Sequence, residues 1–230
     1  MTKVFLPPTY PPAMAPNLVS VFMAGSIEMG VAEDWQPAVI GAIEPFSGLG
    51  QVYNPRREDW DRTWEQSINN PPFSAQVHWE LDLIEQADIV FMHFDPATKS
   101  PISLMEIGVL MGVQDRFRPV PQEVVVSCPE GFWRKGNVDI ICQRSIDRNF
   151  HGYPTVHLFS DPVLAREFLV QRVKVVHKLK SNFFGYFAHE TGLESAPDRK
   201  FPSELRGLKT PKGFSLEKYL EEKEKMEKQK

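Results

Sequence analysis

The sequence predicts an α/β fold, a doubly wound and mostly parallel sheet of five strands with helices on both faces. Short apolar runs alternate along the chain with segments whose apolar residues recur at helical spacing. The 230 residues are enough for one large domain. Their 42% hydrophobic and 24% charged residues are typical of globular proteins. In such sheets the crossovers are right-handed, and ligands bind at the carboxyl ends of the strands.

Each predicted strand is a short run rich in apolar residues, as expected for strands that helices cover on both faces. These runs are residues 18–24, 50–54, 88–94, 123–129 and 155–159. The predicted helices are residues 33–46, 74–87, 102–113 and 161 to about 180. Residues 131–146 are ambiguous, with a short helix around 138–143 as one interpretation. The alternation of these elements predicts the βαβ units of the sheet.

The two ends of the chain differ in composition from the α/β domain, which we place at residues 18–180. Residues 1–17 carry five prolines, which predict an extended arm on the surface with no part in the core. Residues 181–230 form a C-terminal extension. It begins with an aromatic cluster at 183–187, continues as a linker and ends in a charged helical tail at 215–230.

Charge and hydropathy exclude several classes of partner. A formal net charge of -4 gives no global positive field for nucleic acid phosphates, so we expect a small-molecule ligand. No apolar run approaches the ~18 residues of a membrane span. Because Pro7 interrupts the start before a signal peptide can form, we expect a cytoplasmic protein. Cys128 and Cys142 have no metal-ligand spacing, so we expect buried free thiols, no metal and no other cofactor.

Two strand exits offer candidate binding groups. After the first strand, the turn that begins with Gly25 and Ser26 can present main-chain amides to an oxyanion or to ribose oxygens. It matches neither a P-loop nor a GxGxxG motif, and the alternative is a tight turn that needs glycine. After the second strand, Asn54, Arg56 and Arg57 can hold a carboxylate, a phosphate or a base. The alternative there is a solvated loop whose arginines pair with neighbouring acids.

Acidic residues on two predicted helices are candidates for catalysis. Glu106 has mostly apolar neighbours, where a carboxylate is costly unless it is paired or functional. The alternative is a polar stripe of this helix, or a cap near Ser103. On the preceding helix Glu80 and Asp82 cannot share a face, so one faces the site and the other faces solvent. Trp79 is a candidate for stacking on a base, or else a core aromatic.

These segments together resemble the nucleoside 2-deoxyribosyltransferase-like family over about residues 18–127. The elements are Gly-Ser at 25–26, Asn-Pro-Arg-Arg at 54–57, Trp-Glu at 79–80, Ala-Asp at 87–88 and Ser-Pro-Ile-Ser-Leu-Met-Glu-Ile-Gly at 100–108. The resemblance implies a flavodoxin-like fold and an N-glycosidic bond as the target. It also implies that Glu106 is the nucleophile and that Glu80, eight residues before Asp88, is the second acid, with Asp95 as a substitute.

The resemblance implies a nucleoside or nucleotide and a free base as ligands, and a homo-oligomer in which the cluster at 183–187 contacts another subunit. The expected substrate-binding residues are Gly25, Ser26, Asn54, Arg56, Arg57, Trp79, Ser100 and Ser103. Trp60 is an alternative stacking surface. The expected reaction cleaves the N-glycosidic bond through a glycosyl ester of Glu106 and passes the sugar to another base. Hydrolysis of the same bond and a non-catalytic nucleotide-binding module are the alternatives.

Two departures from the family pattern bear on the substrate. Many of the transferases have an aspartate where this chain has Ser100. Related deoxynucleoside monophosphate hydrolases have a serine there, near the 5′-phosphate, but their Gly-Ser-Ile-Arg turn is Gly-Ser-Ile-Glu here, ending at Glu28. The sequence therefore leaves open whether the substrate is a nucleoside or a nucleotide, and whether transfer or hydrolysis follows.

Overall fold

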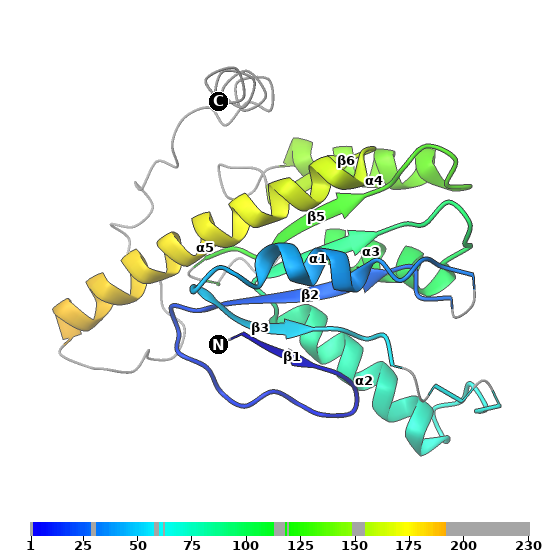
Figure 1. Cartoon of the computed structure of the whole chain (residues 1–230), viewed down its shortest axis with the longest axis horizontal. Helices are drawn as coiled ribbons and strands as arrows, with labels where there is room; N and C mark the ends of the chain where they lie inside the picture. The colour runs from blue at the N-terminus through cyan, green and yellow to red at the C-terminus, as the bar shows by residue number, and fades with distance from the viewer. Residues whose placement is uncertain are drawn as a thin grey trace. The chain divides into compact units, whose positions relative to one another are not determined.

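The computed structural model describes residues 2–28, 31–57, 60–61, 63–112, 118, 120–148 and 155–191, with the main chain alone for 187–191 (Figure 1). The predicted linker and the charged tail at 215–230 lie outside the described residues. Within the described ranges no helix has both the length and the apolar character to cross a membrane.

The described part of the chain folds as a parallel sheet with helices on both faces, as predicted. The strands are β1 (Lys3–Phe5), β2 (Val19–Gly25), β3 (Leu49–Tyr53), β4 (Ile89–His93), β5 (Glu123–Ser127) and β6 (Val156–Phe159). The helices are α1 (Gln36–Ile43), α2 (Pro71–Gln86), α3 (Pro101–Gly112), α4 (Lys135–Arg148) and α5 (Pro162–Thr191). The ambiguous segment therefore contains a full helix, α4, and α5 continues beyond residue 180.

The sheet has six strands rather than the predicted five, in the order β1-β3-β2-β4-β5-β6, and every neighbouring pair is parallel. The additional strand, β1, lies in the proline-rich arm and pairs with β3, with Lys3 opposite Gln51 and Phe5 opposite Tyr53. It can pair because the prolines of the arm start only at Pro7, so residues 3–5 keep their amide donors. The expectation of an arm without a strand is corrected on this point.

The rest of the arm is tied to the α/β domain by hydrogen bonds from side chains. The indole Nε1 of Trp79 donates to the carbonyl oxygen of Thr9 (3.0 Å), and Gln51 Nε2 donates to that of Pro12 (2.7 Å). The arm therefore belongs to the domain, because it extends the β3 edge of the sheet and covers part of α2.

Each face of the sheet has its own hydrophobic core. One core joins α1 and α5 to the sheet through side chains such as Trp35, Ile43 and Leu169. In Figure 1 these two helices lie on the viewer's side of the strands. The other core joins α2, α3 and α4 to the opposite face, with Trp79 and Ile107 fully buried in it. Because helices cover both faces of the sheet, the strands carry apolar side chains on both faces and form continuous apolar runs in the sequence.

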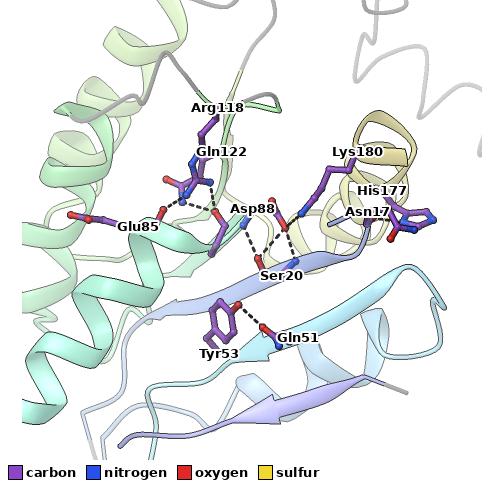
Figure 2. Close-up of polar contacts among 11 residues, drawn as sticks. Asn17, Ser20, Gln51, Tyr53, Glu85, Asp88, Arg118, Gln122, His177 and Lys180 are labelled. Carbon is purple, nitrogen blue, oxygen red and sulfur yellow. Dashed lines mark hydrogen bonds and ion pairs between the residues drawn. The ribbon is translucent and has the colours of Figure 1, made fainter. Parts of the chain in front are cut away.

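A polar network connects the amino ends of β2 and β4 with α5 (Figure 2). Asp88 Oδ2 accepts hydrogen bonds from the Ser20 amide (2.8 Å), the Ser20 hydroxyl (3.0 Å) and Lys180 Nζ (2.7 Å). The Asp88 amide donates in return to Ser20 Oγ (3.0 Å). This network lies at the end of the sheet opposite to the carboxyl ends of the strands, so its role is to hold elements together.

Without β1, the remaining strands have the order 2-1-3-4-5 of a doubly wound sheet, consistent with a flavodoxin-like fold. The strand order reverses between β2 and β4. From β2 the chain passes to α1 on one face, and from β4 it passes to α3 on the other. Such a switch point opens a crevice beyond the carboxyl ends of the strands, where ligands bind in open α/β sheets.

Candidate active site

A cavity of about 490 Å³ lies beside this switch point. Its walls come from the end of β2 and the turn after it, the loop after β3, one side of α2 and the first turns of α3. The lining residues are Phe22, Ala24, Gly25, Ile27, Glu28, Pro55, Arg56, Arg57, Trp60, Gln66, Phe73, Gln76, Val77, Glu80, Leu81, Ser100, Pro101, Ile102, Ser103, Met105, Glu106 and Val109. The volume is within the range of small-molecule sites in proteins.

Two carboxyl groups from different helices face this cavity, Glu106 from α3 and Glu80 from α2. Both side chains are half-buried. Burial raises the pKa of Glu106 to about 8, and the nearby charge of Glu80 adds to this rise. Burial also raises the pKa of Glu80 to about 7, although a hydrogen bond from Gln76 opposes it. Near neutral pH the two groups therefore retain a proton that separate surface glutamates would lose.

The helix that carries Glu80 shows why this acid, and not Asp82, faces the site. Gln76, Trp79 and Leu83 of α2 are buried, and Glu80 adjoins this buried face. Asp82 is exposed on another side of the helix and accepts a hydrogen bond from the Tyr10 hydroxyl (2.7 Å). The two acids therefore lie on different sides of α2, Glu80 at the cavity and Asp82 toward solvent.

Gln76 positions Glu80 and was not identified from the sequence. Its Nε2 donates to Glu80 Oε1 (2.6 Å) and to the carbonyl oxygen of Pro55 (3.2 Å), and its Oε1 accepts from Arg57 (3.4 Å). It thereby links the side of α2 that faces the cavity to the loop after β3. The signal for it in the sequence is its position four residues before Glu80, which places the two side chains on one helix face.

The turn after β2 places one of its two predicted residues at the cavity. Gly25 lines the cavity at a φ of +127°, and a Cβ there would lie 2.1 Å from the carbonyl oxygen of His93, so this position requires glycine. Ser26 is fully buried behind the wall. Its hydroxyl lies 2.8 Å from that of Thr98 and 2.6 Å from that of Ser100, and it accepts a hydrogen bond from the Asp95 amide (2.8 Å).

The loop after β3 brings both predicted arginines to the cavity. Arg56 pairs with Asp34 (3.5 Å) and donates to the carbonyl oxygen of Glu33 (3.2 Å), and Arg57 lies over the ring of Trp64 (5.5 Å). Asn54 does not line the cavity. Its Oδ1 accepts a hydrogen bond from the Arg56 amide (3.1 Å), which shapes the start of this loop.

Besides Ser26 and Asn54, two more of the predicted site residues do not line this cavity. Trp79 has no exposed surface, packs on Phe22 (6.1 Å between ring centroids) and is part of the core, so it cannot stack on a substrate. Asp95 lines a separate cavity and accepts hydrogen bonds from the Glu33 and Ala97 amides (2.8 Å each). Since it is used as a local cap, it does not substitute for Glu80. Of the two tryptophans considered for stacking, Trp60 is the one that lines the cavity with the acids.

No group of three His, Cys, Asp or Glu side chains among the described residues is arranged to hold a metal ion. His93 is buried with its Nδ1 3.0 Å from the Ser127 hydroxyl, and burial lowers its pKa to about 4. The imidazole is therefore neutral at ordinary pH. Cys128 and Cys142 are buried free thiols, as predicted.

The comparison with known families agrees with this geometry. A family model described as nucleoside 2-deoxyribosyltransferase like matches residues 18–132, half of the 230 residues. The chain belongs to this family. The matched range contains all the residues that line the cavity. Membership indicates an enzyme whose small-molecule substrates are nucleosides or bases. No curated protein matches the chain.

Proposed function

We propose that the protein cleaves the N-glycosidic bond of a (deoxy)nucleoside or nucleotide through a covalent ester of Glu106 and transfers the sugar to a second base. The observation that carries this proposal is the convergence of Glu106 and Glu80, from two helices, on one cavity with raised pKa values. A pair of carboxyl groups that shares a proton supplies both a nucleophile and an acid.

In the first half-reaction a Glu106 carboxylate oxygen bonds to the anomeric carbon while the bond from that carbon to the base nitrogen breaks. The electron pair of the broken bond goes to the base, which takes up a proton. Burial and the charge of Glu80 both favour the protonated form of Glu106, so Glu106 must lose its proton before it attacks. The positive charge that develops on the anomeric carbon favours ionised Glu106, and Glu80 then holds the proton for the departing base.

In the second half-reaction a nitrogen of another base attacks the anomeric carbon, the ester bond breaks, and Glu80 takes the proton from the incoming base. Trp60 and Phe73, which line the cavity with ring centroids 6.5 Å apart, supply aromatic surface for either base. Water attack on the same ester gives hydrolysis instead. Both outcomes share the first half-reaction, so the alternatives differ only in the acceptor.

The test is to incubate the protein with a panel of 2′-deoxynucleosides, their 5′-monophosphates and free bases, and to separate the products by chromatography. New nucleosides indicate transfer, and free base without new nucleosides indicates hydrolysis. We expect Glu106→Gln to lower both by at least about 10³-fold, because the ester cannot form. Glu85→Gln, an exposed position on α2, is the matched control and keeps full activity.

Folding of the variant is checked by circular dichroism and thermal unfolding. Because folding raises the pKa of Glu106, its neutral form is favoured in the native state, and the neutral Gln keeps the fold at least as stable as the wild type at pH 8. Undiminished activity of a folded Glu106→Gln variant would reject the proposal. Binding of nucleosides by the wild type without any base release would instead support the non-catalytic module.

A further inference from the structure

Glu28 lies at the end of the cavity where α3 begins. It follows the turn after β2 and lines the cavity. Its Oε1 accepts hydrogen bonds from the main-chain amides of Lys99 (2.8 Å) and Ser100 (2.6 Å). These amides directly precede Pro101, the first residue of the helix. A carboxylate of the chain therefore already occupies two amides at the positive end of α3.

Amides at the start of a helix are a common binding site for phosphate groups, because their N–H groups and the helix dipole both favour an anion. Here the hydroxyl groups of Ser26 and Thr98 both contact Ser100 and hold the conformation that presents these amides. Ser100 has a φ of +44°, unusual for a residue other than glycine, and its hydroxyl lies 2.6 Å from that of Ser26 and 2.7 Å from that of Thr98. With Glu28 on the amides, this arrangement leaves them unavailable to an anionic ligand.

Glu28 is also within reach of the sugar if Glu106 attacks the anomeric carbon. Ser100 and Glu106 are six residues apart, or about 9 Å along the helix axis. Helical side chains lean toward the amino terminus, which brings the Glu106 carboxyl group closer to the start of α3. A furanose ring held at Glu106 can therefore direct its 5′-substituent toward Glu28.

We propose that Glu28 is a specificity-determining residue that selects substrates with an uncharged 5′-hydroxyl and excludes those with a 5′-phosphate. The proposal rests on the proposed function for the position of the sugar. A 5′-hydroxyl donates a hydrogen bond to the Glu28 carboxylate. A 5′-phosphate meets a negative charge and two amides that are already bonded, in a cavity that also contains Glu80 and Glu106.

The arginines of the cavity are the groups that can oppose this selection. Arg56 already pairs with Asp34 and the carbonyl oxygen of Glu33, and Arg57 with Gln76 and the Trp64 ring. Both belong to the loop after β3 and not to the start of α3. If they controlled the 5′-end of the substrate, the monophosphate would be preferred, so the experiment decides between the two effects.

The experiment compares kcat/KM for 2′-deoxynucleosides and their 5′-monophosphates in the wild type, Glu28→Gln and Glu28→Ala. Glu28→Gln removes the charge but keeps an oxygen that can accept hydrogen bonds from both amides. An effect of this variant therefore comes from the lost charge and not from a change in the conformation of the loop. Glu33→Gln removes the same charge from an exposed side chain that lines the other cavity. We expect the wild type to prefer the nucleoside, and both Glu28 variants to lower that preference by about tenfold or more. Glu33→Gln leaves the preference unchanged.

Calorimetric binding of the same ligands makes the test independent of turnover. If no substrate is cleaved, but the nucleoside binds and the monophosphate binds only to the Glu28 variants, the selection by Glu28 stands and the proposed reaction fails. A wild type that cleaves or binds the monophosphate as well as the nucleoside, or that binds neither, overturns the selection. An unchanged preference in both Glu28 variants overturns it as well, while the proposed function remains.

Discussion

At the scale of single residues, the proposed chemistry depends on two glutamates whose pKa values are raised by burial. Glu106 and Glu80 reach the cavity from helices that follow different strands, and each is desolvated by the protein around it. The charge of Glu80 raises the pKa of Glu106 further, so the two groups titrate as a pair. A pair that holds one proton near neutral pH suits a reaction that needs one carboxylate and one carboxylic acid.

We predict a bell-shaped dependence of kcat/KM on pH with its maximum between about 7 and 8. Below pH 7 both carboxyl groups are protonated and no nucleophile is present, whereas above pH 8 both are ionised and no acid is present. Steady-state rates from pH 5.5 to 9.5 check this.

The matched variant for the pH profile is Glu80→Gln, which leaves one of the two groups to titrate. We expect its rate to fall by about 10²-fold or more and its profile to keep a single limb. A wild-type rate that does not change between pH 6 and 9 would show that the pair does not carry the proton of the reaction.

A site residue can be predicted from the sequence where the local periodicity shows on which face of a helix it lies. Glu106 is recognised because a carboxylate among apolar neighbours is costly. Periodicity shows only that Glu80 and Asp82 cannot share a face, and the choice of Glu80 comes from the family resemblance. Periodicity does not tell whether a buried aromatic lies in a cavity wall or in the core, so Trp79 was misplaced. The sequence shows Glu28 only as a departure from the family pattern, because its partners Lys99 and Ser100 are more than 70 residues away in the sequence.

At the scale of elements, the site depends on the placement of α2 and α3 against the sheet, and Asp88 secures the segment between them. Asp88 follows α2, begins the approach to β4, and joins Ser20 of β2 to Lys180 of α5. Figure 2 shows these groups converging at the amino ends of the strands. The Ala-Asp element of the family pattern is therefore structural in this chain, and it fixes where β4 and then α3 begin.

We predict that Asp88→Asn lowers the free energy of unfolding by about 2–4 kcal/mol, because it leaves the partly buried Lys180 without its counter-charge. Urea unfolding measures the loss. The double variant Asp88→Asn, Lys180→Met should lose less than the single one, since no uncompensated charge remains.

The activity of folded Asp88→Asn protein should equal that of the wild type, because the network and the cavity are at opposite ends of the sheet. Unchanged stability, or a loss of activity at unchanged stability, would show that Asp88 has a different role.

The elements missed from the sequence are those that depend on distant pairing. β1 has three residues, two of them exposed, and forms only because β3 offers an open edge 48 residues farther along the chain. α4 was ambiguous because few of its residues are apolar, with Val138 and Cys142 among its buried positions. The fully buried strands β2 and β4 are predicted nearly to their ends, since helices cover them on both sides.

At the scale of the whole described domain, the doubly wound topology explains why the site lies where it does. The strand order reverses between β2 and β4, and the cavity is built from the segments that leave the sheet near this point. The residues that line the cavity lie between Phe22 and Val109, whereas α4, β6 and α5 complete the sheet and its cores. The family match ends at residue 132. The aromatic residues 183–186 lie on α5, and their predicted contact with another subunit stays a prediction.

The most direct test of the account is the mass of the protein during turnover. We predict that rapid acid quenching with excess 2′-deoxynucleoside and no acceptor base traps a species heavier by one deoxyribosyl group, and that peptide mapping places it on Glu106. Glu106→Gln should show no added mass. Base release by the wild type with no adduct at any quench time, or with an adduct on another residue, would contradict the role of Glu106 as the nucleophile.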